Sequence, residues 1–388
     1  MADIEVEAVP LRHRPLEQGI GPDRGEQFVR SSPGLRQPSA SLDSLPHTPL
    51  CAADGPDRGG APRDTNGKVG SDRALKEEFA RDVLAGLCGP SRKRLPARHL
   101  YDSVGSALFE AITRLPEYGL TRADRRLVRR CAPLLADHFR SERIVVAELG
   151  SGSGSKTRVL LEGLGPDRVQ SFCPIDISSE ALNRCARDLS DIVRVRPRHG
   201  PYISGVRALR RDRPPGVPML LLFLGSSIGN FDPQERHALL ADIRAQLLPG
   251  DRLLAGFDLE RSESKLLQAY DDPTGVTAAF NRNVLARVNR ELGASFDLGS
   301  FTHVARYDRR NSRIEMHLVS GREQVVPVRA IGAVCHLRQG ESIWTESSYK
   351  FGAEGVRRSM ESAGFARLDH WTDDEWPMLE GLWAVDDE

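Results

Sequence analysis

The sequence predicts an α/β protein whose parallel sheet is covered by helices on both faces, with a second unit inserted into it and a disordered N-terminal tail. Strand and helix signals alternate between residues 143 and 259. The strand segments are apolar throughout, as in strands buried on both faces. An insertion of about ninety residues then precedes a last helix and two last strands, which indicates a second structural unit.

The chain begins with a stretch that has little capacity to fold. Residues 1–72 are rich in Pro, Gly, Ser and Arg and lack an apolar period, so they bury too little surface to offset the entropy of ordering. Three helices are expected next, because apolar residues recur at helical spacing. The first begins at Ala74, the second runs around residues 106–115 and ends at Pro116, and the third covers RADRRLVRRCAPLLADHF.

The alternating region supplies the sheet. Five strands are expected, over RIVVAEL, QSFCPIDIS, IVRVRP, PMLLLFLGSS and DRLLAGFDL. Helices are expected between them, over KTRVLLEGL, SEALNRCARDL and ERHALLADIRAQLL. Short apolar strands alternating with amphipathic helices are typical of parallel βαβ units.

The pattern changes after Leu259. Two helices are expected over SKLLQAY and TGVTAAFNRNVLARVNRELG, followed by an antiparallel hairpin over THVARYDRRNSRIEMHLVSG, whose polar centre forms the turn. A last helix over GVRRSMESAG and two strands over ARLDHWT and EGLWAV return the chain to the first sheet.

Composition limits the partners and the compartment. Lys+Arg and Asp+Glu number 54 each, so no net charge attracts nucleic acid or an acidic membrane, and a small neutral or zwitterionic partner is expected. No apolar run reaches the ~20 residues that cross a bilayer. The six cysteines are scattered without a C-x-x-C pair, which argues against structural zinc and a disulfide framework. With an acidic start that lacks a secretion signal, these features predict a cytoplasmic protein.

A glycine-rich loop, ELGSGSGSKT, joins the first strand of the sheet to its helix. It differs by one residue from the triphosphate-binding pattern G-x-x-x-x-G-K-[ST], because Ser155 stands where that pattern has glycine. This weakens an ATPase interpretation without removing it, since Asp258 at the end of a later strand is an acid suited to magnesium.

Two other acids favour a nucleoside ligand. Glu148 ends the first strand, and Asp176 ends the second, where it is placed to accept hydrogen bonds from ribose hydroxyls. Glycines also let the backbone approach a ligand closely beside the N–H groups of a helix N-terminus. NAD and S-adenosylmethionine both suit this arrangement, and a tight strand–helix turn without a ligand remains an alternative.

Longer motifs narrow the choice. From about Ala74 to the C-terminus the chain contains, in order, YDSVGSALFEAITRLPEYGLTR, ELGSGSGSKT, PIDIS, FLGSSIGNF, AYDDPTGVTAAFNRNVLARVNREL, RIEMHL and TESSYKF. In these segments it resembles the S-adenosylmethionine-dependent histidine Nα-methyltransferases of ergothioneine biosynthesis. The resemblance implies a Rossmann-like methyltransferase domain over 123–260 and 352–388. It also implies a second, inserted α/β domain that binds the substrate, over 74–122 and 261–351.

The resemblance also implies roles for individual residues. The cofactor is expected to contact Tyr118, Gly150, Lys156 and Asp176, with Asp176 on the ribose and Tyr202 stacked on the adenine. The substrate's amino-acid groups are expected at Asn230 and Tyr270, near Phe109 and Gly225. The resemblance further assigns Glu346 and Ser348 to the imidazole and Met316 and Thr277 to the pocket wall. It places Tyr101 near the substrate, and our hypothesis is that the Tyr101 hydroxyl is the catalytic group beside the amine.

Without the resemblance, simpler roles are open for several of these residues. Glu346 is a candidate surface charge, Tyr270 and Met316 are candidate core residues, and Asn230 fits a turn. One position departs from the family, which usually has an aspartate that binds the adenine amine where this chain has Pro201. Because proline has no side-chain acceptor, that adenine contact is missing or comes from elsewhere.

The reaction implied is the transfer of three methyl groups from S-adenosylmethionine to the α-amine of L-histidine, giving hercynine. The reaction needs a neutral amine held in line with the methyl group. A monomer without a metal is expected. Three alternatives stay open: a methyltransferase acting on another amino acid or aromatic amine, the ATPase, and a binding protein without catalysis.

Overall fold

The computed structural model describes residues 65–89, 91–141 and 143–385, and the side chains of residues 65–72 are not included in the description. Most of the predicted tail therefore lies outside the described residues. Helix α1, Thr65–Leu87, begins earlier than Ala74, so residues 65–72 are helical instead of belonging to the tail. Two glycines in TNGKVGSD lower the helix propensity there, which is why apolar spacing missed this start.

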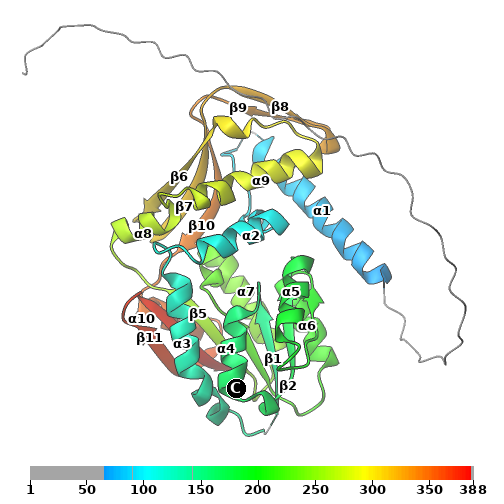
Figure 1. Ribbon diagram of the computed structural model, residues 1–388, viewed down its shortest axis with the longest axis vertical. Coiled ribbons are helices and arrows are strands. Elements are labelled where there is room, and N and C mark those ends of the chain that lie inside the picture. The colour runs from blue at the N-terminus through cyan, green and yellow to red at the C-terminus, as the bar shows by residue number, and fades with distance from the viewer. Residues whose placement is uncertain (1–64, 90, 142, 386–388) are drawn as a thin grey trace, which may run out of the picture. The chain divides into compact units, whose positions relative to one another are not determined.

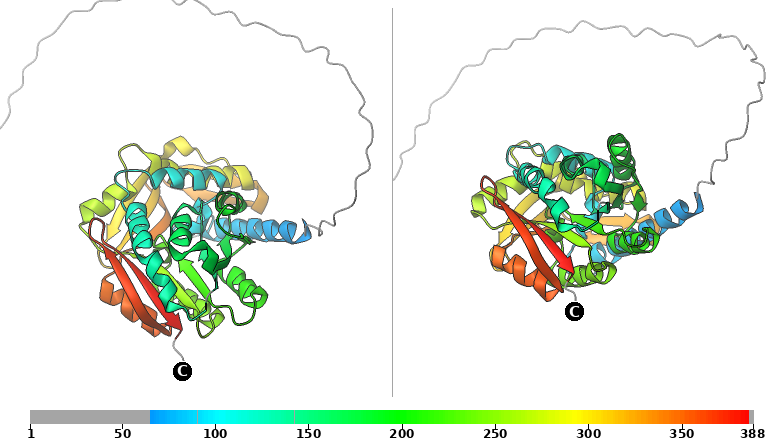
Figure 2. Two further views of the ribbon diagram at one scale, coloured as in Figure 1. Left: turned by 60° about the horizontal axis from the view of Figure 1, so that its bottom comes forward. Right: turned by 90° about the horizontal axis from the view of Figure 1, so that it is seen from below.

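The central sheet has seven strands in the order β11-β12-β5-β4-β1-β2-β3 (Figure 1). The strands are β1 (Ile144–Leu149), β2 (Val169–Asp176), β3 (Arg198–His199), β4 (Met219–Phe223), β5 (Arg252–Asp258), β11 (Phe365–Asp373) and β12 (Met378–Val385). Strands β1 to β5 run parallel to one another, as predicted. The two C-terminal strands pair antiparallel and occupy one edge, where Figure 2 shows them in red.

Two predictions within the sheet were inaccurate. The third strand was expected over IVRVRP, but there only Val195 forms a bridge, to Phe172, and β3 is confined to two later residues. This segment forms the sheet edge, where pairing on one side leaves a short strand. Helix α6, Tyr202–Asp212, was not predicted, because its apolar stripe is short and basic residues surround it.

Helices cover both faces of the sheet, as predicted. Alternate residues of each strand enter different cores: Val146 packs with α3 (Leu120–Leu135), α4 (Ser155–Leu164) and α5 (Ser179–Leu189). Its neighbour Val145 packs with α6, α7 (Pro233–Gln246) and α10 (Ala353–Ser362). This arrangement explains the continuous apolar runs, because both faces of each strand are buried.

The segment between β5 and α10 forms the inserted unit. It contains α8 (Glu263–Tyr270), α9 (Val276–Leu292), β6 (Phe301–Asp308), β7 (Arg313–Ser320), β8 (Gln324–Val328), β9 (Ala333–Leu337) and β10 (Ser342–Tyr349). The predicted hairpin is confirmed as β6 and β7, which join β10 in a three-stranded antiparallel sheet. Strands β8 and β9 form a separate ribbon.

The chain before the central sheet packs against this insertion. Helix α2, Ser103–Ile112, lies beside α9 (Figure 1). The backbone N–H of Leu95 donates a hydrogen bond of 2.8 Å to the carbonyl of Trp344 in β10. Segments far apart in sequence therefore build one unit.

A disulfide joins Cys88 after α1 to Cys335 in β9, with 4.4 Å between the Cα atoms. The scattered cysteines had argued against a disulfide framework. This bond was missed because its two cysteines are 247 residues apart, which leaves no spacing signal in the sequence. Cys131, Cys173 and Cys185 are buried free thiols.

In the part of the chain that the structure describes, no helix is long and apolar enough to cross a membrane.

Candidate active site

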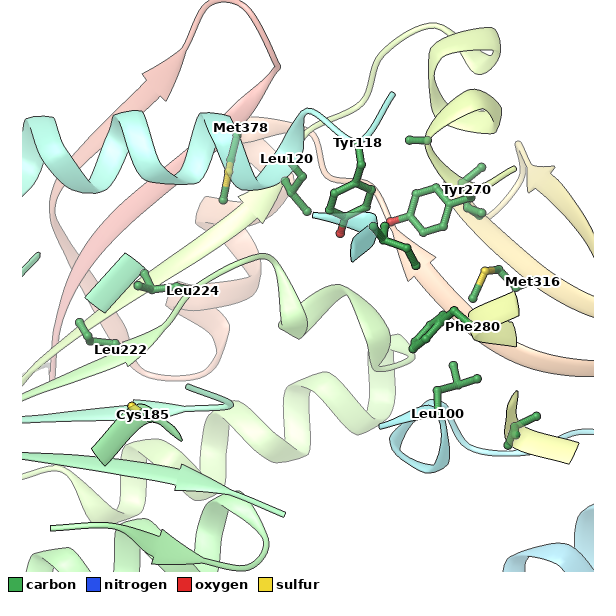
Figure 3. Close-up of a cluster of buried hydrophobic side chains, with 14 of the residues drawn as sticks. Leu100, Tyr118, Leu120, Cys185, Leu222, Leu224, Tyr270, Phe280, Met316 and Met378 are labelled. Atoms are coloured by element: carbon green, nitrogen blue, oxygen red, sulfur yellow. The ribbon is translucent and has the colours of Figure 1, made fainter. Parts of the chain in front are cut away.

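A pocket lies where the loop after β4 meets the inserted unit. Its lining comes from the segment before the sheet (Tyr101, Phe109, Ile112, Tyr118, Leu120), the loop after β4 (Gly225, Ser226, Ser227, Asn230) and the insertion (Ala269, Tyr270, Thr277, Phe280, Met316, Glu346, Ser348). The structure thus brings together every residue that the sequence predicted for the substrate, with Tyr101 and Tyr118. Figure 3 shows Tyr118, Tyr270, Phe280 and Met316 around this region.

Aromatic rings form much of the pocket wall. Tyr101 meets Phe109 and Phe280 edge-on, with ring centroids 5.4 and 5.5 Å apart. Tyr118 meets Tyr270 in the same manner at 6.2 Å. Enclosure by these rings, with the Glu346 carboxylate nearby, raises the pKa of Tyr101 well above its ordinary value, so the phenol keeps its proton at neutral pH.

Two polar side chains come from one face of β10. Glu346 and Ser348 are two residues apart, which places both on the same side of the strand, and both are buried. Burial raises the pKa of Glu346 to about 7, against the opposing charge of Lys350. Among the described residues, no side chain hydrogen-bonds the Glu346 carboxylate, so its oxygens are open to a ligand in the pocket.

A hydrogen-bonded network lies behind Ser348. The Tyr270 hydroxyl donates to Ser348 Oγ at 2.7 Å, and Lys350 Nζ donates to both oxygens, at 2.9 and 2.8 Å. Lys350 also pairs with Asp258 at the end of β5, at 2.8 Å. Burial alone would raise the pKa of Asp258, but Lys350 and Arg261 hold it below its ordinary value. Asp258 is therefore occupied by two cations, which disfavours the magnesium role that kept the ATPase interpretation open.

The loop after β4 makes a tight, unusual turn. Gly225 and Ser226 have φ values of 72° and 58°, in the left-handed region that is costly for serine. The Ser226 hydroxyl compensates by accepting a hydrogen bond of 2.9 Å from the backbone N–H of Asp258. A Cβ at Gly225 would lie 3.0 Å from Lys156 Nζ, so glycine lets this lysine approach the pocket wall. Asn230 ends the following short 3₁₀ helix.

The predicted cofactor residues lie at the carboxyl ends of β1 and β2, where open α/β sheets bind ligands. Gly150 has a φ of 73°, and the Tyr202 hydroxyl lies 2.9 Å from where a Cβ would project, so this ring packs against the glycine loop. Asp176 ends β2 and accepts backbone hydrogen bonds from Ser178 at 2.9 Å and Gly152 at 3.4 Å. Burial raises its pKa.

The start of α4 carries a second cluster of charges. Lys156 forms an ion pair with the buried Asp124 of α3, and the Thr157 hydroxyl donates to Glu148. Burial opposes the charge of Lys156, but Asp124 and Glu148 raise its pKa overall. Burial raises the pKa of Glu148 to about 7. Lys156 is therefore bound to a carboxylate and is not a free phosphate ligand.

Sequence reasoning missed part of this region. Leu120, Ser226 and Phe280 line the pocket without having been singled out. It also missed Lys350, although a signal was present. Residues 346, 348 and 350 alternate along one extended segment, so a prediction of β10 would have placed all three on one face.

Comparison with known proteins agrees with this geometry. The family model described as "Histidine-specific methyltransferase, SAM-dependent" matches residues 79–382. The histidine N-alpha-methyltransferase of Mycobacterium tuberculosis is 41% identical over 299 residues, which cover 76% of this chain and 91% of that protein. Ergothioneine biosynthesis protein 1 of Neurospora crassa is 29% identical, over 72% of this chain and 32% of that protein. The L-tryptophan methyltransferase of Psilocybe serbica is 26% identical, over 76% and 89%. The chain therefore belongs to the family of histidine-specific methyltransferases, enzymes that depend on S-adenosylmethionine.

Proposed function

We propose that the enzyme adds three methyl groups to the α-amine of L-histidine and so produces hercynine. The pairing of Glu346 and Ser348 in one buried pocket carries this proposal. An imidazole ring has one N–H donor and one acceptor nitrogen, and this pair offers a carboxylate acceptor and a hydroxyl. A site built this way disfavours apolar analogues, because they leave its polar groups unpaired.

The cofactor is proposed to lie along the ends of β1 and β2. The backbone hydrogen bonds that Asp176 accepts from Ser178 and Gly152 use only part of the lone pairs of its carboxylate, so others are left for the ribose hydroxyls. The rest of the cofactor would be surrounded by the Gly150 backbone, Tyr118 and Lys156, and Tyr202 would stack on the adenine. Pro201 caps α6 and offers no side-chain acceptor, so we assign no adenine contact to it.

The remaining pocket residues are proposed to hold the amino acid. Asn230 and Tyr270 would bind its α-amino and carboxylate groups, because their polar groups line the pocket. Met316 and Thr277 would shape the wall beside the imidazole, since both are almost fully buried. This assignment leaves the α-amine at the side of the pocket that is nearest the loop after β4.

S-adenosylmethionine supplies an electrophilic methyl group when it is bound, so the protein's task is mainly to position the amine. The amine must be neutral, because an ammonium has no lone pair to attack. We assign Tyr101 to this step. Its raised pKa keeps the phenol protonated, so it is not a charged base. It acts as a relay, in which its own O–H proton passes to a water molecule while its oxygen takes the proton that leaves the ammonium.

We further propose that the enzyme is a monomer, acting in the cytoplasm without nucleic-acid or membrane partners. Its zero net charge supports the lack of such partners. Exposed large apolar side chains, such as Leu84, Val104 and Leu368, come from separate elements, which supports a monomer. One observation opposes the cytoplasmic assignment, because the Cys88–Cys335 disulfide is of a kind that a reducing compartment disfavours. Light scattering tests the monomer. A thiol count on freshly isolated protein tests the compartment: reduced cysteines at these two positions support the cytoplasm, and an intact disulfide contradicts it.

A second candidate is the methylation of another amino acid or aromatic amine. The ring wall of Tyr101, Phe109 and Phe280 favours it, because such a wall also suits larger aromatic side chains. Ser348 argues for histidine, because an indole has an N–H for Glu346 but no second ring nitrogen for Ser348.

The proposal is tested in two stages. Calorimetric titration with S-adenosylhomocysteine first establishes cofactor binding. Mass spectrometry then follows the products formed from S-adenosylmethionine with L-histidine and, in parallel, with L-tryptophan. We expect a histidine product heavier by three methyl groups. Methylation of tryptophan in place of histidine would establish the second candidate, and absent cofactor binding would overturn both.

A further inference from the structure

A buried group of charges behind the pocket has no part in the function proposed so far. The side chains of Lys350, Asp258 and Arg261 are at most 4% exposed. The Asp258 carboxylate accepts from Arg261 at 2.6 and 3.0 Å, from Trp376 Nε1 at 3.2 Å, and from Lys350 at 2.8 Å. The Arg261 guanidinium also stacks on the Trp376 ring, 3.8 Å from its centroid. Asp258 is thus a fixed anchor for the lysine.

Lys350 distributes its three ammonium protons among three acceptors. These are the Asp258 carboxylate, the Tyr270 hydroxyl at 2.9 Å and Ser348 Oγ at 2.8 Å. An ammonium has three donors and no acceptor, so its capacity is filled. Its orientation is therefore determined on all sides, and the contact with Ser348 is part of a rigid arrangement.

This arrangement determines the direction of the Ser348 hydroxyl. Its oxygen accepts from Lys350 and also from the Tyr270 hydroxyl, at 2.7 Å. A hydroxyl oxygen has two lone pairs and one proton. Because both lone pairs are used on the network side, the proton is left for the pocket, which Ser348 lines together with Glu346.

We propose that Lys350, anchored by Asp258, is a positioning residue that makes Ser348 a hydrogen-bond donor toward the substrate. The Ser348 donor and the Glu346 acceptor together select a substrate whose side-chain ring carries both an N–H and a nitrogen with a lone pair. The inference rests on the proposed function, since it concerns which ring the same pocket accepts. A fixed donor also avoids the cost of ordering a free hydroxyl on binding.

Pyrrole analogues of histidine isolate this effect. In the two isomers of pyrrolylalanine, one or the other ring nitrogen is replaced by carbon. The isomer whose N–H lies at the position that faces Glu346 lacks the nitrogen that would accept from Ser348. The ratio of kcat/KM for histidine to that for the better isomer therefore reports the Ser348 donor alone. Losing one such bond lowers a ratio about tenfold.

The test compares Lys350→Met, Ser348→Ala and the double variant. We expect each single variant to lower the histidine-to-pyrrole ratio about tenfold and the double variant to lower it no further, because both changes remove the same interaction. A purely structural role of Lys350 would reduce turnover of both substrates equally. An unchanged ratio in Lys350→Met, or additive losses in the double variant, would overturn the proposal.

Two controls separate the possible failures. Wild-type enzyme that binds S-adenosylhomocysteine but does not methylate histidine would refute the proposed function, whereas an active wild type with an unaltered Lys350→Met ratio refutes this inference alone. If Lys350→Met does not fold, as judged by S-adenosylhomocysteine titration, Tyr270→Phe replaces it. That variant removes the second of the two donors that fill the Ser348 lone pairs, so its ratio should fall toward the Ser348→Ala value. A ratio equal to that of the wild type would overturn the proposal.

Discussion

Burial sets the protonation of two titratable side chains that line the pocket, Tyr101 and Glu346. Tyr101 keeps its proton, because the pKa of its phenol is raised well above the ordinary value. The pKa of Glu346 is raised to about 7, so this carboxyl changes charge near neutral pH. Both shifts come mainly from removal of water, which disfavours the charged form.

Tyr101→Phe tests the proposed role of the phenol. The variant keeps the ring contacts with Phe109 and Phe280 and loses only the hydroxyl. We expect kcat to fall at least tenfold with little change in the KM for histidine, because proton transfer typically contributes ~10²-fold or more. Steady-state methylation assays measure both constants, with Phe109→Leu as a control for ring packing. An unaltered kcat would remove Tyr101 from the mechanism.

Glu346 makes the stability of the unliganded protein depend on pH. Its folded pKa of about 7 exceeds the ordinary 4.5, so the folded chain binds a proton that the unfolded chain releases between these values. Stability is therefore lost as pH rises from about 4.5 to 7. In Glu346→Gln this loss is absent, so the Tm of the variant relative to wild type should increase from pH 5 to pH 8. The corresponding free energy is at most about 3 kcal/mol.

Thermal unfolding at several pH values, without ligands, measures this difference. Glu323→Gln serves as a control, because Glu323 is exposed. Parallel curves for wild type and Glu346→Gln would show that Glu346 has an ordinary pKa in the folded protein.

At the scale of elements, β10 determines the character of the pocket. Its pairing with β7 sets Glu346 opposite Met316, while the alternation of side chains puts Glu346 and Ser348 on one face. The strand is polar in sequence, TESSY, and the face that carries Glu346 and Ser348 lines the pocket instead of packing in a core. That polarity is also why apolar alternation did not reveal it.

The end of α1 is tied to β9 by the Cys88–Cys335 disulfide. Phe79, Val83 and Leu87 bury the helix in the core, so the disulfide adds to an existing attachment. We expect reduction by dithiothreitol to lower the Tm by about 5 °C, because cross-links of this kind contribute ~2–4 kcal/mol. The Cys335→Ser variant should show the lower Tm with and without reductant. A reductant effect of equal size in that variant would locate its origin elsewhere.

At the scale of the whole molecule, the active site exists only where three parts of the chain meet. Tyr101 precedes the central sheet, Asn230 follows β4, and Ser348 ends the insertion. The residues proposed for the cofactor lie at the carboxyl ends of β1 and β2 in the same sheet, and one of them, Lys156, reaches the pocket wall at Gly225. Ligand binding is therefore expected to stabilise the fold as a whole.

S-adenosylhomocysteine should raise the Tm, and at a given concentration the rise should be larger the lower its Kd. At a concentration one hundred times its Kd, a ligand that binds only the folded state adds ~2.7 kcal/mol. Asp176→Asn removes the charged ribose acceptor, so we expect the Kd to rise ~10- to 100-fold. Thermal shift and calorimetry measure both effects, with exposed Asp167→Asn as the control. Equal affinity in the two variants would contradict the assignment of Asp176.

The order of elements was largely predictable, and the site was predictable in outline. Apolar runs such as PMLLLFLGSS and the helical spacing of α5 follow from burial, so the sequence alone predicted a layered α/β sheet with an insertion. The residues that the resemblance assigned to the substrate line one pocket, whereas Gly150, Lys156, Asp176 and Tyr202 are not part of its lining. The roles of these residues remain predictions. The sequence did not predict α6 or β8–β10, and it misplaced the short edge strand β3, because the patterns of these elements are brief or polar.

The sequence by itself determined the family, the α/β class and the glycine loop between β1 and α4, since these depend on local order along the chain. Only the tertiary structure decided the partners of Asp258, Lys156 and Ser348. Asp258 and Lys350 are 92 residues apart, yet they meet because β5 ends beside the end of β10. Electrostatic and hydrogen-bond partners depend on distance in space, which no local pattern encodes. The acid that had suggested magnesium is thus an anchor for the lysine beneath the substrate pocket.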